Sequence, residues 1–391
     1  MSDVKSSGLD GIVFADTAIS DVDGERGRLV IAGSDVEQLA AEGGFEAAAT
    51  RVLAAGGWDP GPRKGDPRAE ESPILAALGP ASDHSPSGLD LRSTLATARA
   101  QAWEMLPRLG DALQATDGMD ALRAALAHLR STGDDGQDAI AAIGAAPVFV
   151  AAWSRKRSGA APVAPDAKLD HAADYLRMTI GKTPSLDASR ALDAYLVTVI
   201  DHGMNASTFT ARVVTSTASD LISAVVAAVG ALKGPLHGGA PGPVLDMLDA
   251  IGTPAGAEQW LLGELAAGRR IMGMGHRIYR VRDPRAAVLE TAVKSLASER
   301  LALARGVEAA AAKILAERRP DRPLAANVEF YTAVLLDAVG LPREQFSPTF
   351  AVGRIAGWSA HVIEQRRTGR LVRPQSKYVG PMPAAPSPTT A

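Results

Sequence analysis

Four stretches of the chain set scarce polar residues beside glycines or helix ends, where backbone can approach a ligand closely. They are D-H-G-M-N-A-S-T (Asp201 to Thr208), K-G-P-L-H-G-G-A-P-G-P (Lys233 to Pro243), I-M-G-M-G-H-R-I-Y-R-V-R-D-P-R (Ile271 to Arg285) and N-V-E-F-Y-T (Asn327 to Thr332). Histidine and glutamate can transfer protons, and arginine can hold an anion. These stretches are therefore the candidates for chemistry.

The first two stretches contain one candidate histidine each. His202 and Asn205 lie in a turn that we predict between two apolar helices, and Ser207 or Thr208 could cap the second helix. A hydrogen-bonded helix junction explains this stretch equally well. His237 is surrounded by glycine and proline, and a merely packed histidine would not need such backbone freedom. The lack of a G-K-[ST] sequence excludes a Walker phosphate loop.

The third stretch combines a histidine with a group of arginines. His276 is followed within nine residues by Arg277, Arg280, Arg282 and Arg285. Arginines bind carboxylates and phosphates through paired hydrogen bonds, so this group suits a polyanionic ligand. A solvated basic turn is the alternative. The preceding glycines do not complete a dinucleotide-binding fingerprint, and no strand precedes them.

The fourth stretch places Glu329 among apolar and aromatic residues. Taken alone, it is an ordinary carboxylate of a first helical turn. Arg354 and Arg373 lie in apolar or proline-flanked surroundings, and a buried arginine usually has an anionic partner. Both arginines thus count weakly toward the same anion site.

The elements that must position these residues are predicted to be mostly helical. The chain has 391 residues, 46% hydrophobic and 22% charged, with abundant alanine, which favours helices. Short apolar runs from Gly11 to Gly33 predict a small β-ribbon, and Ser34 and Glu37 have the spacing of a capping box. Single helices are predicted over 207–232 and 286–318. Residues 56–90 can be assigned only at a short helical patch, 74–78.

Composition also limits the partners. The net charge of -3 and the scattered basic residues argue against nucleic-acid binding. The chain has no cysteine, which excludes disulfides, thiolate metal sites and a cysteine nucleophile. Its start has no apolar segment of the secretory type, and its most apolar run, Leu221 to Leu232, is shorter than the ~20 residues that span a bilayer. We expect a cytoplasmic protein without membrane contact, and the proline-rich C-terminal tail to be disordered.

Taken together, the four stretches, the contexts of Arg354 and Arg373, and the opening G-L-D-G-I-V-F-A-D-T-A-I-S-D-V-D-G-E-R-G-R-L resemble citrate synthase. The resemblance covers residues 8–55 and about 168–380, with its motifs in the family's order. It implies an all-α homodimer with a large and a small domain. The large domain would comprise 1–237 and 345–391, and the small domain 238–344. Oxaloacetate and acetyl-CoA would be the substrates, without a metal or a tightly bound cofactor.

The resemblance also implies roles for single residues. His237 would hydrogen-bond the thioester oxygen while Glu329 removes a methyl proton, and His276 would polarise the oxaloacetate carbonyl. The positions that match substrate-binding residues are His202, Asn205, Arg285, Arg354 and, from the other subunit, Arg373. The positions that match the CoA-binding region are Ile271, Gly273, Met274, Gly275, Arg280 and Asn327.

Two positions depart from the family's pattern. Glu329 stands where the family usually has aspartate, which moves the carboxylate one methylene further from the backbone, and misplacement by ~1 Å can cost ~100-fold in rate. Val199 stands where many members have a further histidine. Glu329 favours one alternative, a weakened paralogue that senses CoA or oxaloacetate. The other alternative shares the chemistry: a 2-methylcitrate synthase would use propionyl-CoA, and one methyl group is discriminated by only ~1 to 3 kcal/mol.

Overall fold

The N-terminal ribbon has three antiparallel strands. The computed structural model describes residues 9, 11–59, 90–237, 241–276, 278–296, 298–318 and 324–382. The strands are β1 (Ser20–Asp23), β2 (Arg28–Ile31) and β3 (Ser34–Asp35), with Ser20 opposite Ile31. The predicted ribbon is confirmed. Ser34 was expected to cap the next helix but pairs with Ile31 in β3, and α1 (Val36–Ala41) has no side-chain cap.

Helices make up nearly all other regular structure in the described residues, which confirms the all-α class. Those of the first half are α2 (Gly44–Gly56), α4 (Leu91–Met105), α5 (Gly118–Leu126), α6 (Asp135–Arg157), α7 (His171–Ile180) and α8 (Leu186–Thr198), with 3-10 turns at Leu106–Arg108 and Ala112–Gln114. The predicted patch at 74–78 lies outside the described residues.

Two helices that we predicted as continuous are each divided. Residues 207–232 form α9 (Ala206–Ser216) and α10 (Leu221–Leu232), because Ala218 has a φ of 66° and Asp220 caps α10 by accepting the Ser223 N–H. Residues 286–318 form α13 (Pro284–Ser295) and α14 (Arg300–Arg318). The segments on both sides of each break are helical and apolar, so we had joined them into one helix.

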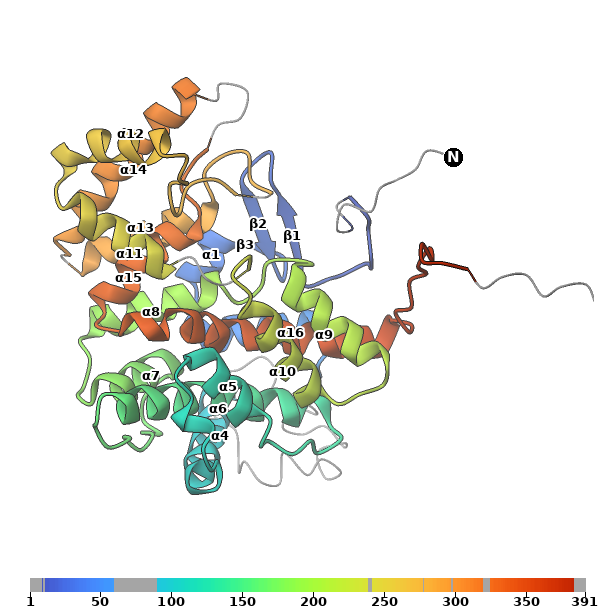
Figure 1. The fold of residues 1–391 in the computed structure, drawn as a ribbon. Coiled ribbons are helices and arrows are strands. Elements are labelled where there is room, and N and C mark those ends of the chain that lie inside the picture. Colours follow the sequence, from blue (N-terminus) through green and yellow to red (C-terminus); the bar gives the residue numbers. More distant parts are fainter. Residues whose placement is uncertain are drawn as a thin grey trace, which may run out of the picture.

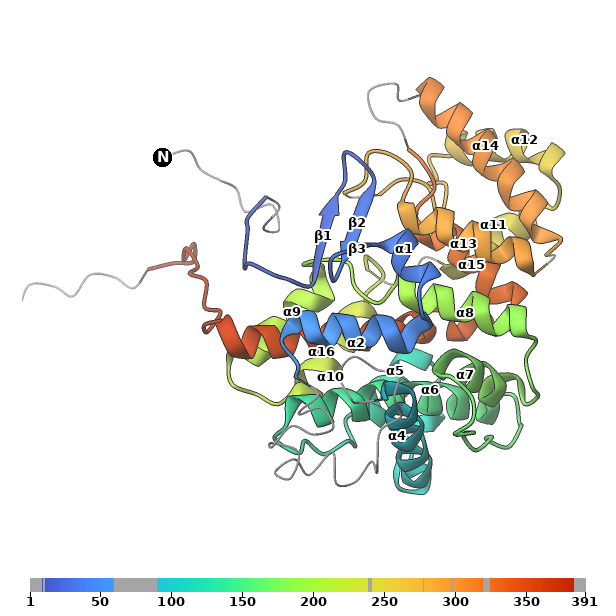
Figure 2. The ribbon, with the colours of Figure 1, turned by 180° about the vertical axis from the view of Figure 1, so that it is seen from behind.

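The remaining helices place the later motifs. They are α11 (Pro241–Ile251), α12 (Ala257–Ala266), α15 (Val328–Ala338) and α16 (Phe346–Thr368), with 3-10 turns at Pro254–Gly256 and Arg343–Gln345. Helices α11 to α15 gather at one end of the molecule in both opposite views (Figures 1 and 2). Helix α16 runs through the other part and packs against α2, α6 and α9. Helix α8 contacts α13, α15 and α16, so it lies at the junction of both groups.

Helices α6 and α16 are the longest of the described chain, with 23 residues each. By length and composition, an apolar segment of α6 could cross a membrane. However, 89% of that apolar segment is buried inside the protein, against α4, α5 and α16 among others. It has the surroundings of a core helix.

Candidate active site

The turn between α8 and α9 is built by Asn205. Its Oδ1 accepts hydrogen bonds from the Ser207 and Thr208 N–H groups, both at 3.1 Å. Asn205, not Ser207 or Thr208, is therefore the N-cap of α9. Its Nδ2 donates to the carbonyl of Gly203 at 3.3 Å, so both ends of the carboxamide hold the turn. The predicted contact of Asn205 with substrate stays a prediction.

The same turn buries His202 beside two aromatic partners. Its Nε2 is 3.1 Å from the Tyr279 hydroxyl, and its ring centroid is 5.5 Å from that of His276. Burial, with Arg285 as the strongest nearby charge, holds the pKa of His202 well below its usual value. His202 is thus neutral at physiological pH. Tyr279 was not predicted as a site residue, and its only signal in the sequence is that it is an aromatic residue inside the arginine-rich stretch.

Residues 273–275 pair with residues 325–327 and so join His276 to the start of α15. Gly275 N donates to the Ala325 carbonyl at 2.7 Å, and Asn327 N donates to the Gly273 carbonyl at 3.0 Å. Gly273 has a φ of 72°, and a Cβ there would lie 2.9 Å from the Phe330 ring. Only glycine permits both the conformation and the close approach.

His276 has a defined tautomer. Its Nδ1 accepts the backbone N–H groups of Ile278 and Tyr279, both at 3.1 Å. The proton of the neutral ring is therefore on Nε2. Burial, assisted by Arg285, lowers the pKa of His276 to about 4. The ring is a neutral hydrogen-bond donor at neutral pH.

His237 is fixed by Ser207 and Trp358. Its Nε2 accepts the Ser207 N–H at 3.3 Å and lies 2.8 Å from the Ser207 Oγ, which in turn accepts from Trp358 Nε1 at 3.1 Å. Because Nε2 is the acceptor, Nδ1 carries the proton and can donate. Burial, with Arg354 nearby, lowers the pKa of His237 to about 4. Residues 238–240 lie outside the described part of the chain.

Glu329 lies in the first turn of α15, after the N-cap Asn327. Its backbone N–H donates to Asn327 Oδ1 at 3.0 Å, whereas its carboxylate atom Oε2 is buried and has no hydrogen-bond partner among the described residues. Burial raises the pKa of Glu329 to about 7, against the opposing effects of Arg285 and Arg354. A carboxyl with these properties can accept a proton near neutral pH.

The two buried arginines predicted to bind substrate, Arg285 and Arg354, differ in their partners. Arg285 forms a bidentate pair with Asp283, at 3.0 and 2.7 Å. Arg354 donates from Nε to the Val199 carbonyl at 2.5 Å and forms no ion pair within the described residues. Burial lowers the pKa of Arg354 to about 10. Arg354 is thus a buried cation whose charge an anionic ligand could compensate.

Arg373 does not reach this site in its own chain. Its side chain is exposed, and the neighbouring Val372 N–H donates to Ser216 Oγ at 3.1 Å. Ser216 is the last residue of α9. Asn205 caps the other end of this helix, about 16 Å away at 1.5 Å per residue.

The residues predicted to hold CoA are partly engaged within the chain. The carbonyls of Gly273 and Gly275 and the Gly275 N–H pair with residues 325–327, and the side chains of Ile271 and Met274 are buried in the core. Arg280 is exposed, with Nε 3.9 Å from Glu25 Oε1. Arg277 lies outside the described residues. The CoA-binding roles of the Ile271–Gly275 region stay predictions.

Comparison with known proteins identifies the family. The sequence model described as "Citrate synthase, C-terminal domain" matches residues 8–375, nearly the whole chain. The chain belongs to the citrate synthase family. Among its relatives, "Putative citrate synthase 2" of Mycobacterium tuberculosis is 38% identical over 97% of this chain and 94% of its own. A 2-methylcitrate synthase of the same species is 34% identical over 97% and 91%.

Solved citrate synthase structures have the same fold. The crystal structure of citrate synthase from Thermotoga maritima has a TM-score of 0.77 at 32% identity, and 98% of each chain is covered. The citrate synthase of Thermoplasma acidophilum, solved as a ternary complex with carboxymethyl coenzyme A and oxaloacetate, has a TM-score of 0.78 at 25% identity, again over 98% of each chain.

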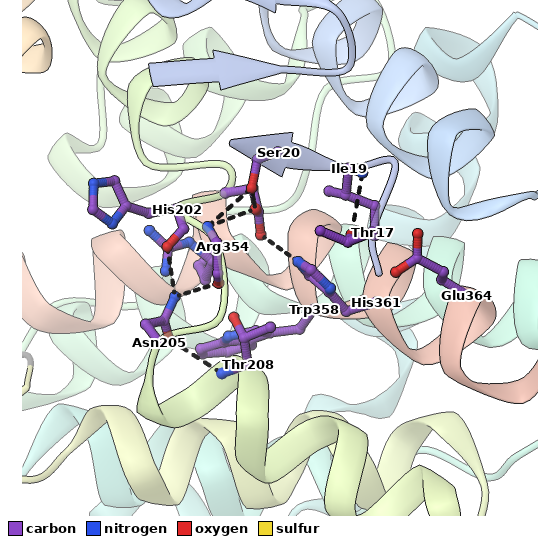
Figure 3. A network of polar contacts seen from close by, with 12 residues as sticks. Thr17, Ile19, Ser20, His202, Asn205, Thr208, Arg354, Trp358, His361 and Glu364 are labelled. Carbon is purple, nitrogen blue, oxygen red and sulfur yellow. Dashed lines mark hydrogen bonds and ion pairs between the residues drawn. The ribbon is translucent and has the colours of Figure 1, made fainter. Parts of the chain in front are cut away.

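In this citrate synthase family member, a buried polar network supports the His202 turn. His361 Nε2 donates to Asp201 Oδ1 at 3.1 Å, and the other oxygen of Asp201 accepts from Ser20 Oγ at 2.5 Å. Arg212 donates to His361 Nδ1 and pairs with Glu364. Figure 3 shows this chain of contacts leading from His361 to Ser20, beside His202 and Arg354.

This network was not predicted from the sequence. Its signal was present in α16, where His361, Glu364 and Gln365 are spaced to share one face of an otherwise apolar helix. Such residues at a buried face need polar partners, but the sequence does not say which.

Proposed function

We propose that the protein is a citrate synthase, an acyltransferase that condenses acetyl-CoA with oxaloacetate and water to give citrate and CoA. One observation carries this proposal: two neutral histidines with defined tautomers and a carboxyl with a buried, unpaired oxygen all lie near Arg285 or Arg354, and Arg354 forms no ion pair within the described residues. Carbon–carbon bond formation next to a thioester needs a base and two oxygen-directed donors, and these residues can provide them.

The first step is removal of a methyl proton from acetyl-CoA. Glu329 takes the proton, since its pKa of about 7 makes it a stronger base than an ordinary carboxylate. His237 donates from Nδ1 to the thioester oxygen, where negative charge develops. A neutral donor suits this step, and such a fixed donor in a water-excluded site typically contributes about 3 to 4 kcal/mol.

The second step is attack of the resulting enol or enolate on oxaloacetate. His276 donates from Nε2 to the ketone oxygen, and Arg285, Arg354 and His202 hold the dianion. Water then hydrolyses citryl-CoA. Arg354 has no carboxylate partner among the described residues, which supports this assignment, whereas Arg285 already has Asp283 and would have to share its guanidinium.

Dimer formation and domain closure complete the proposal. We assign residues 238–344 to a small domain that closes over the substrates and so excludes water. The exposed Arg373 of one subunit would reach the active site of its partner. Both assignments extend the family resemblance. Subunit mixing tests the role of Arg373, and solution scattering with and without ligands tests domain closure.

A 2-methylcitrate synthase is the second candidate, and the 34% identical relative with that name favours it. It would use propionyl-CoA in the same steps. A third candidate, a weakened paralogue that binds CoA or oxaloacetate as a sensor, is favoured by the longer side chain of Glu329.

A thiol-release assay separates these candidates. Oxaloacetate is supplied with either acetyl-CoA or propionyl-CoA to the native protein, Glu329→Asp and Glu329→Gln. We expect turnover with acetyl-CoA to exceed that with propionyl-CoA, and Glu329→Gln to lose at least ~100-fold. Native turnover by Glu329→Gln would show that the base is wrongly assigned. No native turnover with either thioester would favour the sensor.

A further inference from the structure

The hydroxyl of Tyr195 is buried without a hydrogen-bond partner in the described structure. The side chain is fully buried in α8. An unpaired buried polar group costs about 1 to 3 kcal/mol, so such groups are rare in folded proteins. Oε2 of Glu329 is unpaired and buried as well. The Tyr195 hydroxyl can donate a hydrogen bond, and the Glu329 carboxylate can accept one.

Tyr195 lies in the last turn of α8, the end of this helix that approaches the candidate active site. Residues four apart share a helix face, so Tyr195 shares its face with Val199. The Val199 side chain approaches Gly353, and the Val199 carbonyl accepts from the neighbouring Arg354. Helix α8 also packs against α15, which carries Glu329.

The charges around both groups agree with this placement. Burial raises the pKa of Tyr195 well above its usual value, and Glu329 is the charged residue that acts on it most strongly. Arg354 and Arg285 act on it in the opposite direction. The charges that act on Glu329 come from Arg285 and Asp283 near the start of α13 and from Arg354 of α16. Tyr195 therefore keeps its proton and is the uncharged donor beside these groups.

We propose that Tyr195 is a positioning residue whose hydroxyl donates a hydrogen bond to the ionised carboxylate of Glu329. In this structure the two atoms are not bonded to each other. Rotation of the Glu329 side chain makes the bond when the carboxyl ionises. A glutamate has one more rotatable bond than the aspartate usual in the family, so its carboxylate needs an additional contact to stay in place. The catalytic part of this inference rests on the proposed function.

Tyr195→Phe tests the proposal, and Tyr175→Phe is its matched control. Both tyrosines are fully buried, but the Tyr175 hydroxyl is paired with Thr349 Oγ1 at 2.7 Å. The first readout is the titration of the Glu329 carboxyl by infrared spectroscopy, assigned from its loss in Glu329→Gln. We expect its pKa to be higher in Tyr195→Phe than in the native protein and unchanged in Tyr175→Phe.

The second readout is steady-state kinetics. We expect Tyr195→Phe to lower kcat about ten-fold, as for a lost hydrogen bond to a charged group, while KM for oxaloacetate stays within about two-fold. An unchanged pKa of the Glu329 carboxyl in Tyr195→Phe would overturn the proposal. This holds if kcat and KM are both unaltered, and also if KM alone rises, which would show that the hydroxyl contacts substrate. A native protein without turnover would defeat the proposed function, whereas the carboxyl titration would still decide the role of Tyr195.

Discussion

Asn327 connects the two ends of the candidate active site through one carboxamide. Its Nδ2 donates to the Gly275 carbonyl at 2.8 Å, and its Oδ1 accepts the Glu329 N–H at 3.0 Å. Gly275 directly precedes His276. The residue that caps α15 therefore also sets where His276 lies relative to Glu329.

Asn327→Ala should lower kcat more than its effect on stability explains. Loss of an N-cap costs about 1 kcal/mol, and a shift of His276 by ~1 Å can cost ~100-fold in rate. Asp220→Ala is the control, because Asp220 caps α10 through the Ser223 N–H at 2.8 Å, away from the site. Both variants should unfold at a lower temperature than the native protein, but only Asn327→Ala should have a lower kcat. Equal kcat values would show that Asn327 is only a cap.

The reaction rate should fall as pH decreases through about 7. The pKa of Glu329 is raised to about 7, so the base is protonated below that pH and ionised above it. His237 and His276, with pKa values of about 4, stay neutral between about pH 5 and 9 and add no further limb there. The measurement is kcat/KM for acetyl-CoA against pH. A midpoint near 4.5 would contradict the raised pKa of the base.

Ser207→Ala should slow the enzyme by about ten-fold or more, since His237 then loses the hydroxyl at 2.8 Å from its Nε2. The Trp358 indole loses its acceptor as well, so its fluorescence should change. Ser189→Ala is the control, because the Ser189 hydroxyl is buried and bonds only the Ser185 carbonyl of its own helix. Native kcat in Ser207→Ala would show that the hydroxyl does not orient His237.

Gly24→Ala should reduce activity through the ribbon. The Gly24 carbonyl accepts the Arg280 N–H at 2.9 Å, and a Cβ at Gly24 would lie 2.4 Å from the Ile278 carbonyl oxygen. The loop that orients His276 must then move, and we expect kcat/KM to fall at least ~10-fold. Gly263→Ala, with no atom within 4 Å of the new Cβ, is the control. Unchanged kinetics in both variants would show that the ribbon does not position this loop.

Subunit mixing tests the proposed role of Arg373. Arg373→Ala and Glu329→Gln should each be nearly inactive as homodimers. Unfolded together and refolded, they form heterodimers in which one site has both native residues, so about a quarter of native activity should return. A fully active Arg373→Ala, or a monomeric native protein in sedimentation, would contradict a shared site.

The chemistry of the site could be read from residue types and local spacing. Histidines among glycines, a glutamate at a predicted helix start and a row of arginines are local features, and so are the ribbon and most helices. Helix breaks were missed where a short polar interruption with a cap, such as Asp220, separates two apolar helices. A cap is a short-range signal. When the segments on both sides of it are apolar and helical, their periodicity hides the cap in the prediction.

The identity of each partner depended on packing between distant segments. Tyr279 meets His202 across 77 positions, and Asn327 meets the Gly275 carbonyl across 52. Such contacts also set the tautomers of His237 and His276, and they leave the Tyr195 hydroxyl without a hydrogen-bond partner among the described residues. The sequence alone determined which groups could act as base, donor or anion ligand, because side-chain chemistry is local. Only the tertiary structure decided which are buried, paired or left free, because burial and hydrogen bonding arise when separate helices meet.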